Sequence, residues 1–169
     1  MLTQGFTTIT NNSVNSEVEL IKTREYENDY FSFNYSSDWK ISDNEDMGDG
    51  VYYVSVEKKG LDDSGLVTIM SYNQMLDLDD LIQFDLDDLK NNESLKKFKN
   101  QEFKNSIYNK NDTRSSTYTF EVYGLKFKGI IHAFSSENNT VIIANQEAEE
   151  DSKKNASGFK VIEESFQLK

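Results

Sequence analysis

The acidic string LDLDDLIQFDLDDL, at residues 76–89, holds the side chains of this chain that are best placed to bind a charged partner. At about 100° per residue, a helix collects the leucines and Ile82 in one apolar arc and leaves most of the aspartates outside it. Carboxylates gathered on one helix surface attract a basic protein surface. The string therefore predicts a protein-binding helix face with four acids: Asp79, Asp80, Asp87 and Asp88.

One aspartate of this string, Asp85, does not fit a solvent-facing role. It falls near the middle of the apolar arc, between the directions of Leu81 and Ile82. Two interpretations stay open. Either the helix frays or curves toward solvent at this point, or Asp85 is partly buried with a hydrogen-bonding partner.

A second acidic segment, DNEDMGDG at residues 43–50, indicates an alternative function as an ion-binding or small-ligand-binding domain. An EF-hand loop is excluded, because Met47 occupies the third or the fifth loop position in either register that the glycines allow. An irregular Ca²⁺ site or an ordinary solvated loop remains. Trp39, Tyr52 and Tyr53 could line a ligand pocket, although aromatic residues at strand spacing are more typical of a core. The candidate metal ligands of this alternative are Asp43, Glu45, Asp46 and Asp49.

Enzymatic chemistry has little support in this sequence. The only histidine is His132, which excludes a metal site of several imidazoles and leaves a hydrolase centred on His132 as a remote alternative. No Gly-Xaa-Ser-Xaa-Gly motif accompanies it, so a histidine on a sheet under a helix is the simpler interpretation. The 8 glycines form no phosphate-binding loop, and there is no cysteine. We therefore expect no enzyme activity, no catalytic residues and no cofactor.

The charge of the chain narrows the class of partner. Asp and Glu number 30 against 18 Lys and Arg, which gives a formal net charge of −12 at pH 7. This charge repels phosphate backbones and anionic lipid headgroups, so we expect no nucleic acid partner and no membrane insertion of the domain itself. No apolar run is long enough to span a bilayer. The expected partner is an unidentified protein with a basic surface.

Two helices are expected to position these side chains. The segment 77–90 has the helical period described above, and Asp77 suits its N-cap. A second helix is expected over 148–163, where small and apolar residues recur at spacings of three and four. Gly158 costs a helix interior about 1 kcal/mol relative to Ala, so it is a candidate end point for this helix. The residues of the second stripe are Ala148, Ser152, Ala156, Phe159, Ile162 and Phe166.

The rest of the chain is rich in strand-forming residues. An edge strand is expected near VELIKTREYEN, and a strand, a turn and a second short strand in YFSFNYSSDWKIS. Six further runs read as strands, with SFQL as a short closing strand: VYYVSVEKK, GLVTIMSYN, EFKNSIYNK, RSSTYTFEVYG, LKFKGIIHAFSS and NTVIIANQE. This order of strands, helix, strands and helix indicates an α+β domain with one large antiparallel β-sheet flanked by helices.

Two of these segments carry a resemblance to a known family. YFSFNYSSDWKIS looks like the early aromatic strand, turn and Trp of the PsbP-like domains, and the stretch from Gly124 to Lys169 looks like their terminal hairpin, helix and closing strand. The family includes the extrinsic photosystem II subunit, Ran-binding nucleotide-release factors and bacterial proteins of unknown role. The resemblance runs from about Tyr26 to Leu168 and implies a PsbP-like α/β/α sandwich. None of the family's partner-binding residues finds a match here, so no functional position is carried over.

The chain is expected to divide into a flexible N-terminal extension or tether, residues 1–16, and a single PsbP-like domain, residues 17–169. The opening residues MLTQGFTTIT lack a basic and an apolar region, so no export signal is visible in them. A full-length chain would accordingly be cytoplasmic. A chain from which a leader was trimmed would be extracytoplasmic or lipid-anchored.

Overall fold

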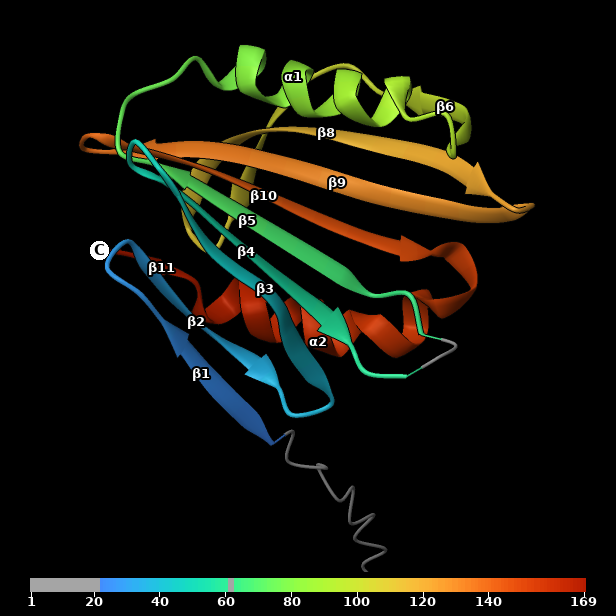
Figure 1. Cartoon of the computed structure of the whole chain (residues 1–169), viewed down its shortest axis with the longest axis horizontal. Helices are drawn as coiled ribbons and strands as arrows, with labels where there is room; N and C mark the ends of the chain where they lie inside the picture. The colour runs from blue at the N-terminus through green and yellow to red at the C-terminus, as the bar shows by residue number, and fades with distance from the viewer. Residues whose placement is uncertain (1–21, 61–62) are drawn as a thin grey trace, which may run out of the picture.

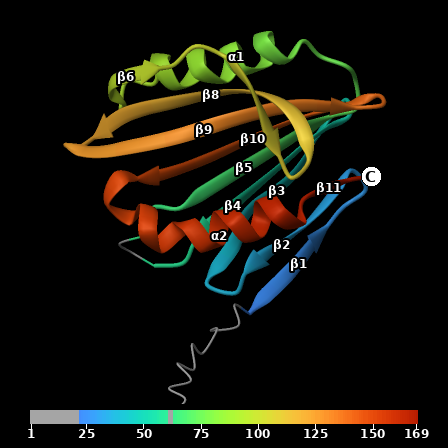
Figure 2. The same ribbon diagram turned by 180° about the vertical axis from the view of Figure 1, so that it is seen from behind.

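The computed structural model describes residues 22–60 and 63–169 and arranges them in three layers (Figure 1). An eight-stranded antiparallel sheet forms the middle layer. Helix α1, Leu78–Asn91, covers one face of this sheet, and helix α2, Ser152–Ser165, lies on the other face beside a three-stranded sheet. The view from behind shows the same layers (Figure 2). The predicted α+β class, with a sheet flanked by helices, is confirmed.

The main sheet has the strand order β3-β4-β5-β10-β9-β8-β6, and β7 also pairs with β8. Its strands are β3 (Trp39–Gly48), β4 (Val51–Lys58), β5 (Leu66–Tyr72), β6 (Lys96–Asn100), β7 (Lys104–Tyr108), β8 (Asn111–Val122), β9 (Leu125–Ser136) and β10 (Asn139–Ala148). Strands β3 to β5 form one meander and β8 to β10 another, and the pairing of β5 with β10 joins the two. The site described below lies over this central junction.

The small sheet has the order β1-β2-β11, with β1 at Thr23–Glu27, β2 at Phe31–Ser36 and β11 at Gln167–Leu168. The expectation of a single sheet was therefore wrong, because β2 turns away from β3 at Ser37 and Asp38 and pairs with the chain's last strand instead. The closing strand expected at SFQL is present as β11. Residues 1–21, which include the proposed tether 1–16 and the first part of the expected edge strand, lie outside the described residues.

Helix α1 begins and ends within one residue of its predicted bounds. The Asp77 side chain caps it, since Oδ1 accepts hydrogen bonds of 3.0 Å from the backbone amides of Asp79 and Asp80. The apolar arc packs on the sheet, as predicted, against β9, β8 and β6, and three of its residues are buried: Leu81, Ile82 and Leu86. Burying an apolar stripe of this kind is what holds a 14-residue helix on a sheet, because an isolated helix of that length is marginal in water.

Trp39 is the centre of the core on the opposite face of the sheet, and only 1% of its surface is exposed, as predicted. It lies between two glycines. A Cβ on Gly65 would lie 2.6 Å from Cη2 of the Trp39 ring, and a Cβ on Gly158 would lie 2.3 Å from Cε2. Gly158 therefore allows α2 to approach the ring, and it does not end the helix as we had expected.

The buried face of α2 differs from the predicted stripe. Ala156 is exposed, and Asn155 is fully buried and donates a hydrogen bond to Oε2 of Glu147. The predicted stripe also began too early. Ala148 ends β10, and a short 3₁₀ turn at Glu149–Asp151 precedes the helix. The prediction missed this face because a buried Asn and Gly carry no apolar signal.

Two strands occupy segments for which the sequence had predicted a loop or no element. Strand β3 extends through most of the acidic segment 43–50, and β6 lies within the Lys-rich segment 90–104. Both stand at the edges of the main sheet. Within residues 22–60 and 63–169, no helix is long and apolar enough to cross a membrane.

Candidate functional site

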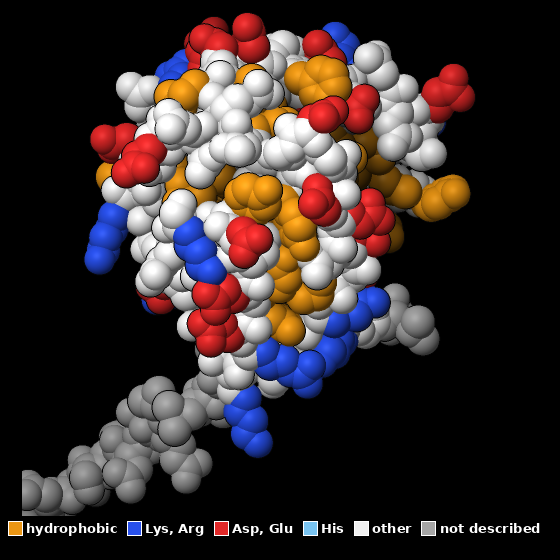
Figure 3. Space-filling view, turned by 60° about the vertical axis from the view of Figure 1, so that its left-hand side comes forward, with side chains coloured by type: hydrophobic (Ala, Val, Ile, Leu, Met, Phe, Trp, Pro, Cys, Tyr) orange, Lys and Arg blue, Asp and Glu red, His pale blue; other side chains and the backbone are white. Residues whose placement is uncertain are grey.

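The outer surface of α1 carries three of the four acids that were predicted to bind a protein. Asp80, Asp87 and Asp88 are exposed, and Nε2 of Gln83 donates a 2.9 Å hydrogen bond to Asp87. Phe84 lies on the same helix with 68% of its surface exposed. In the space-filling view, acidic side chains are spread over the face from its upper end, where α1 lies, to its lower part, and a group of Lys and Arg side chains lies along the lower edge (Figure 3).

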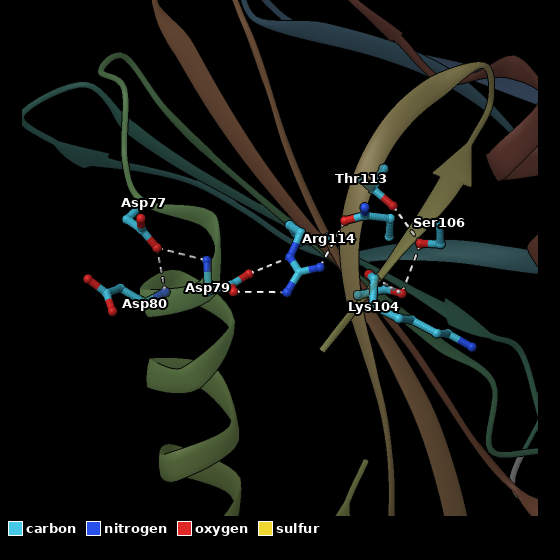
Figure 4. A network of polar contacts seen from close by, with 9 residues as sticks. Asp77, Asp79, Asp80, Lys104, Ser106, Thr113 and Arg114 are labelled. Carbon is cyan, nitrogen blue, oxygen red and sulfur yellow. Dashed lines mark hydrogen bonds and ion pairs between the residues drawn. The ribbon is translucent and has the colours of Figure 1, made fainter. Parts of the chain in front are cut away.

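The fourth acid, Asp79, has a partner within the fold (Figure 4). Nε and Nη2 of Arg114, on β8, donate hydrogen bonds of 2.6 and 2.9 Å to its two carboxylate oxygens. Nη1 of Arg114 donates a 2.8 Å bond to Asn105 on β7. The hydrogen bond from Arg114 holds the pKa of Asp79 below its ordinary value. Asp79 therefore ties the first turn of α1 to the sheet, and its charge is already neutralised.

The inner side of α1 and the sheet beneath it enclose a cleft of about 400 Å³. Its floor is apolar and comes from the central strands, with Met70 on β5, Ile131 on β9 and Ile142 on β10. Polar groups stand around this floor: Tyr53, Thr68, Asp85, Asp88, Asn92, Tyr118 and Gln146. An apolar cavity of this size with a few polar groups is the usual form of a small-molecule site.

Asp85 points from α1 toward this cleft. It is half-buried, so the interpretation that the helix frays or curves into solvent was wrong, and α1 is continuous past it. Burial, and next the nearby charge of Asp88, raise the pKa of Asp85 to about 6. Its expected hydrogen-bonding partner is missing from the hydrogen bonds and ion pairs of residues 22–60 and 63–169. Asp85 is thus a shielded carboxyl with no hydrogen-bond donor among the residues that the structure describes.

The tyrosine pair of β4 points to opposite faces of the sheet. Tyr52 packs beside Tyr30, with ring centroids 5.8 Å apart, and Tyr53 lines the cleft under α1. Both are half-buried because each face of the main sheet has a covering layer. One member of the pair therefore contributes to a cavity, and the other to the core around Trp39.

The acids of segment 43–50 are spread along β3 and its turn. Asp43 accepts a 3.2 Å hydrogen bond from Ser55, and Asp46 accepts one of 2.9 Å from the Gly48 amide. Glu45 is opposite Tyr53 in the ladder, and Asp49 occupies the turn with φ of 51°. Neither here nor elsewhere in the described part of the chain do three or more His, Cys, Asp or Glu residues form a group that could hold a metal ion.

His132 lies in the core on the α2 side of the sheet, with 7% of its surface exposed. Its Nδ1 is 3.1 Å from the Thr113 hydroxyl and 3.2 Å from the Ser106 hydroxyl, and its ring lies against Tyr108. Burial, and next the charge of Lys104, lower the pKa of His132 to about 4, so the ring is neutral at pH 7. No carboxylate hydrogen-bonds to this imidazole among the described residues.

Comparison with known proteins shows a similarity of fold. No protein-family model matches the sequence, and a search of curated proteins found no match. Three of the similar solved structures come from bacteria. The solution structure of cyanobacterial PsbP (CyanoP) from Synechocystis sp. PCC 6803 has a TM-score of 0.60 and 11% identity, over 94% of this chain and 99% of that chain.

The other two are more distant. A crystal structure from Bacteroides thetaiotaomicron VPI-5482 has a TM-score of 0.51 and 18% identity, over 82% of this chain and 45% of that chain. The crystal structure of LpqN, involved in cell envelope biogenesis of Mycobacterium tuberculosis, has a TM-score of 0.44 and 10% identity, over 90% and 87% of the two chains. The predicted PsbP-like fold is confirmed by the likeness to CyanoP.

Proposed function

We propose that this PsbP-like domain is a non-catalytic accessory domain that binds a basic surface of a partner protein through the outer side of α1. The contact residues are Asp80, Phe84, Asp87 and Asp88, which we name the α1 docking face. The exposed Phe84 is the observation that carries this proposal.

Phe84 supplies an apolar anchor among charged groups. Residues four apart follow one another along a helix surface, so Asp80, Phe84 and Asp88 form one line, with Asp87 beside it. An aromatic ring that is 68% exposed gains free energy when a partner covers it, and aromatic anchors often dominate the energy of an interface. The surrounding acids favour a partner protein with a basic surface.

The charges of the docking face are available to a partner. Among the described residues, Asp80, Asp87 and Asp88 form no ion pair, in contrast to Asp79. Like charges on one helix destabilise it slightly, and a Lys- or Arg-rich partner would relieve that repulsion. The formal charge of −12 would also accelerate encounter with such a partner.

The chemistry of the remaining groups favours binding over catalysis. His132 is buried, neutral at pH 7 and held between hydroxyl groups, so it is poorly placed to meet a substrate. The acids of segment 43–50 point along an edge strand and its turn, which gives an ion few converging ligands. The accessory role therefore rests on the one exposed aromatic and acidic helix surface.

The test is site-specific photo-crosslinking in extracts of the cells that make the protein. A photoreactive phenylalanine analogue replaces Phe84, and in a matched control it replaces Tyr123, which is fully exposed in the β8–β9 turn. We expect one discrete adduct with a basic protein from position 84 and none from position 123. Changing Asp80, Asp87 and Asp88 to Asn should reduce the yield of that adduct strongly, because the partner then associates more slowly.

The same adduct from both positions, or an adduct whose yield is unchanged by the three Asn substitutions, would show that the docking face does not select the partner. Neither outcome would test the cleft on the inner side of α1, which is a separate site.

A further inference from the structure

We propose that the cleft between α1 and the main sheet is a binding site for a small organic cation, an amine with an apolar body whose ammonium group lies against Asp85. This site is on the sheet-facing side of the helix, and it does not depend on the docking face. The two surfaces share only Asp88, which is exposed and also borders the cleft.

The shape and floor of the cleft suit an apolar body. Its volume of about 400 Å³ is large enough for a ligand the size of a phenylalkylamine. Met70, Ile131 and Ile142 come from three adjacent strands and give a continuous apolar floor. A hydrocarbon group placed there would lose contact with water without displacing a polar partner of the protein.

The charges of the cleft select a cation. Asp85 and Asp88 both line it, and no Lys, Arg or His is among its described lining residues. The fold thus brings two carboxyl groups together at a partly shielded site, and no described lining residue gives either of them a counter-charge. Burial of a carboxylate without a partner is unfavourable, so a ligand ammonium would supply the charge-assisted hydrogen bond that the fold omits.

Two tyrosine side chains line the cleft and could form cation–π contacts with the ligand. Tyr53 on β4 and Tyr118 on β8 both line the cleft, and the Tyr118 hydroxyl donates a 3.2 Å hydrogen bond to Gln146. Burial, and next the charge of Asp85, raise the pKa of Tyr118 and of Tyr72, and Asp85 lines the same cleft as Tyr118. Aromatic faces attract ammonium groups, so the walls and the carboxyl act together.

The ionisation of Asp85 makes the proposed binding dependent on pH. The titratable groups that face it are Asp88 on α1, Tyr72 on β5 and Tyr118 on β8, and Tyr53 lies across the cleft. The tyrosines stay neutral, because burial raises the pKa of each from its ordinary value. Asp85 is therefore the group that changes charge near pH 6, and affinity for a cation should rise as it ionises.

The experiment uses phenethylamine as the probe, followed by amide NMR of the whole chain. The matched compounds are phenylethanol, which is neutral, and phenylpropionate, which is anionic. At pH of about 8, we expect the amine to shift the amides of Thr68, Ala144 and Gln146 on the cleft floor, with affinity about tenfold above that at pH of about 5. The neutral compound should bind at least about tenfold more weakly, and the anion should not bind.

Two substitutions on the same helix separate the cleft from general charge effects. Asp85→Asn should weaken amine binding about tenfold at the higher pH and remove the pH dependence. Asp87→Asn changes the net charge equally but lies on the outer side, so binding should be unchanged. Absence of cleft shifts at millimolar amine, equal binding of the alcohol, or equal effects of the two substitutions would each overturn the proposal. Loss of the crosslinked adduct at Phe84 would leave these results unaffected.

Discussion

At the scale of single residues, Asp85 and His132 are two shielded titratable groups whose pKa values move in opposite directions. Burial raises the pKa of Asp85 from 3.8 to about 6 and lowers the pKa of His132 from 6.5 to about 4. The folded state holds the proton of Asp85 more tightly than the unfolded chain does, so stability falls as pH rises from about 4 through 6. His132 has the opposite effect on the stability of the protein. Its pKa is lower in the folded state than in the unfolded chain, so stability is lost as pH falls below about 6.5.

The two effects overlap between pH 4 and 6 and largely offset each other, so the intact protein should show a shallow pH profile in this window. Asp85→Asn removes the contribution of Asp85 and leaves that of His132. We expect the free energy of unfolding to rise by about 1–2 kcal/mol at pH of about 7.5 and to change little at pH of about 4. Urea unfolding at the two pH values measures this difference.

Asp87→Asn is the control, since Asp87 is exposed on the next turn. It should change stability slightly and equally at both pH values. A stabilisation by Asp85→Asn that is the same at both pH values would contradict the assignment to ionisation. The Asp85 carboxylate lowers the stability of the folded state, and it is also the group that would bind a cation in the cleft. The destabilisation and the proposed function therefore belong to the same residue.

At the scale of elements, α2 packs closely on Trp39 because Gly158 has no Cβ. Alanine at a helical position usually gains about 1 kcal/mol over glycine. At Gly158 the added carbon would lie 2.3 Å from the Trp39 ring, which is itself confined on its other side by Gly65. Overpacking of this kind costs about 1–3 kcal/mol or more, so the usual gain should be reversed.

We expect Gly158→Ala to lower the free energy of unfolding by about 2 kcal/mol, measured by denaturation followed through the fluorescence of Trp39. Ser157→Ala, on the exposed neighbouring position, is the control and should be neutral or slightly stabilising. If the two variants were equally stable, the close packing of α2 on Trp39 would be wrong.

The elements that the sequence predicted well are those whose apolar period is strong. Leu81, Ile82 and Leu86, together with the Asp77 cap, indicated α1 to within a residue. The start of β3 at Trp39 was predicted as a short strand, whereas the rest of β3 and all of β6 were missed, because most of their side chains remain in water and give no apolar alternation. Both are edge strands, where charged side chains discourage pairing with other chains. Their acidic and basic composition is therefore typical of loops, although their backbones pair.

The candidate site was predictable only in part, for a similar reason. The four acids of α1 follow from the helical period, and the position of Asp85 in the apolar arc indicated partial burial as one alternative. The partner of Asp79 could not be foreseen, because Arg114 is 35 positions away and the order of the strands decides their contact. The cleft also depends on strand order, since β5, β9 and β10 meet only in the folded sheet.

At the scale of the whole molecule, the formal charge of −12 gives the protein a negative field. Acidic side chains are spread over the face in Figure 3, and a group of Lys and Arg side chains lies along its lower edge, away from α1. A negative field attracts a basic partner before contact, which raises the association rate more than it raises the final affinity. We expect the acids around Phe84 in the α1 docking face to contribute most to this attraction.

This electrostatic attraction gives the last prediction, which concerns the partner captured at Phe84. Changing Asp80, Asp87 and Asp88 to Asn should slow association about tenfold at low salt and make it less sensitive to salt, with little change in dissociation. The melting temperature should stay the same or rise slightly, because repulsion on α1 is relieved. Asp79 is left intact, since its pair with Arg114 holds the helix to the sheet. The control changes three exposed acids on β1, in the β1–β2 connection and on β3 to their amides, namely Glu25, Asp29 and Glu45, which removes the same charge from the total of −12. If both triple variants slowed association equally in stopped-flow measurements, net charge and not the α1 docking face would govern the encounter.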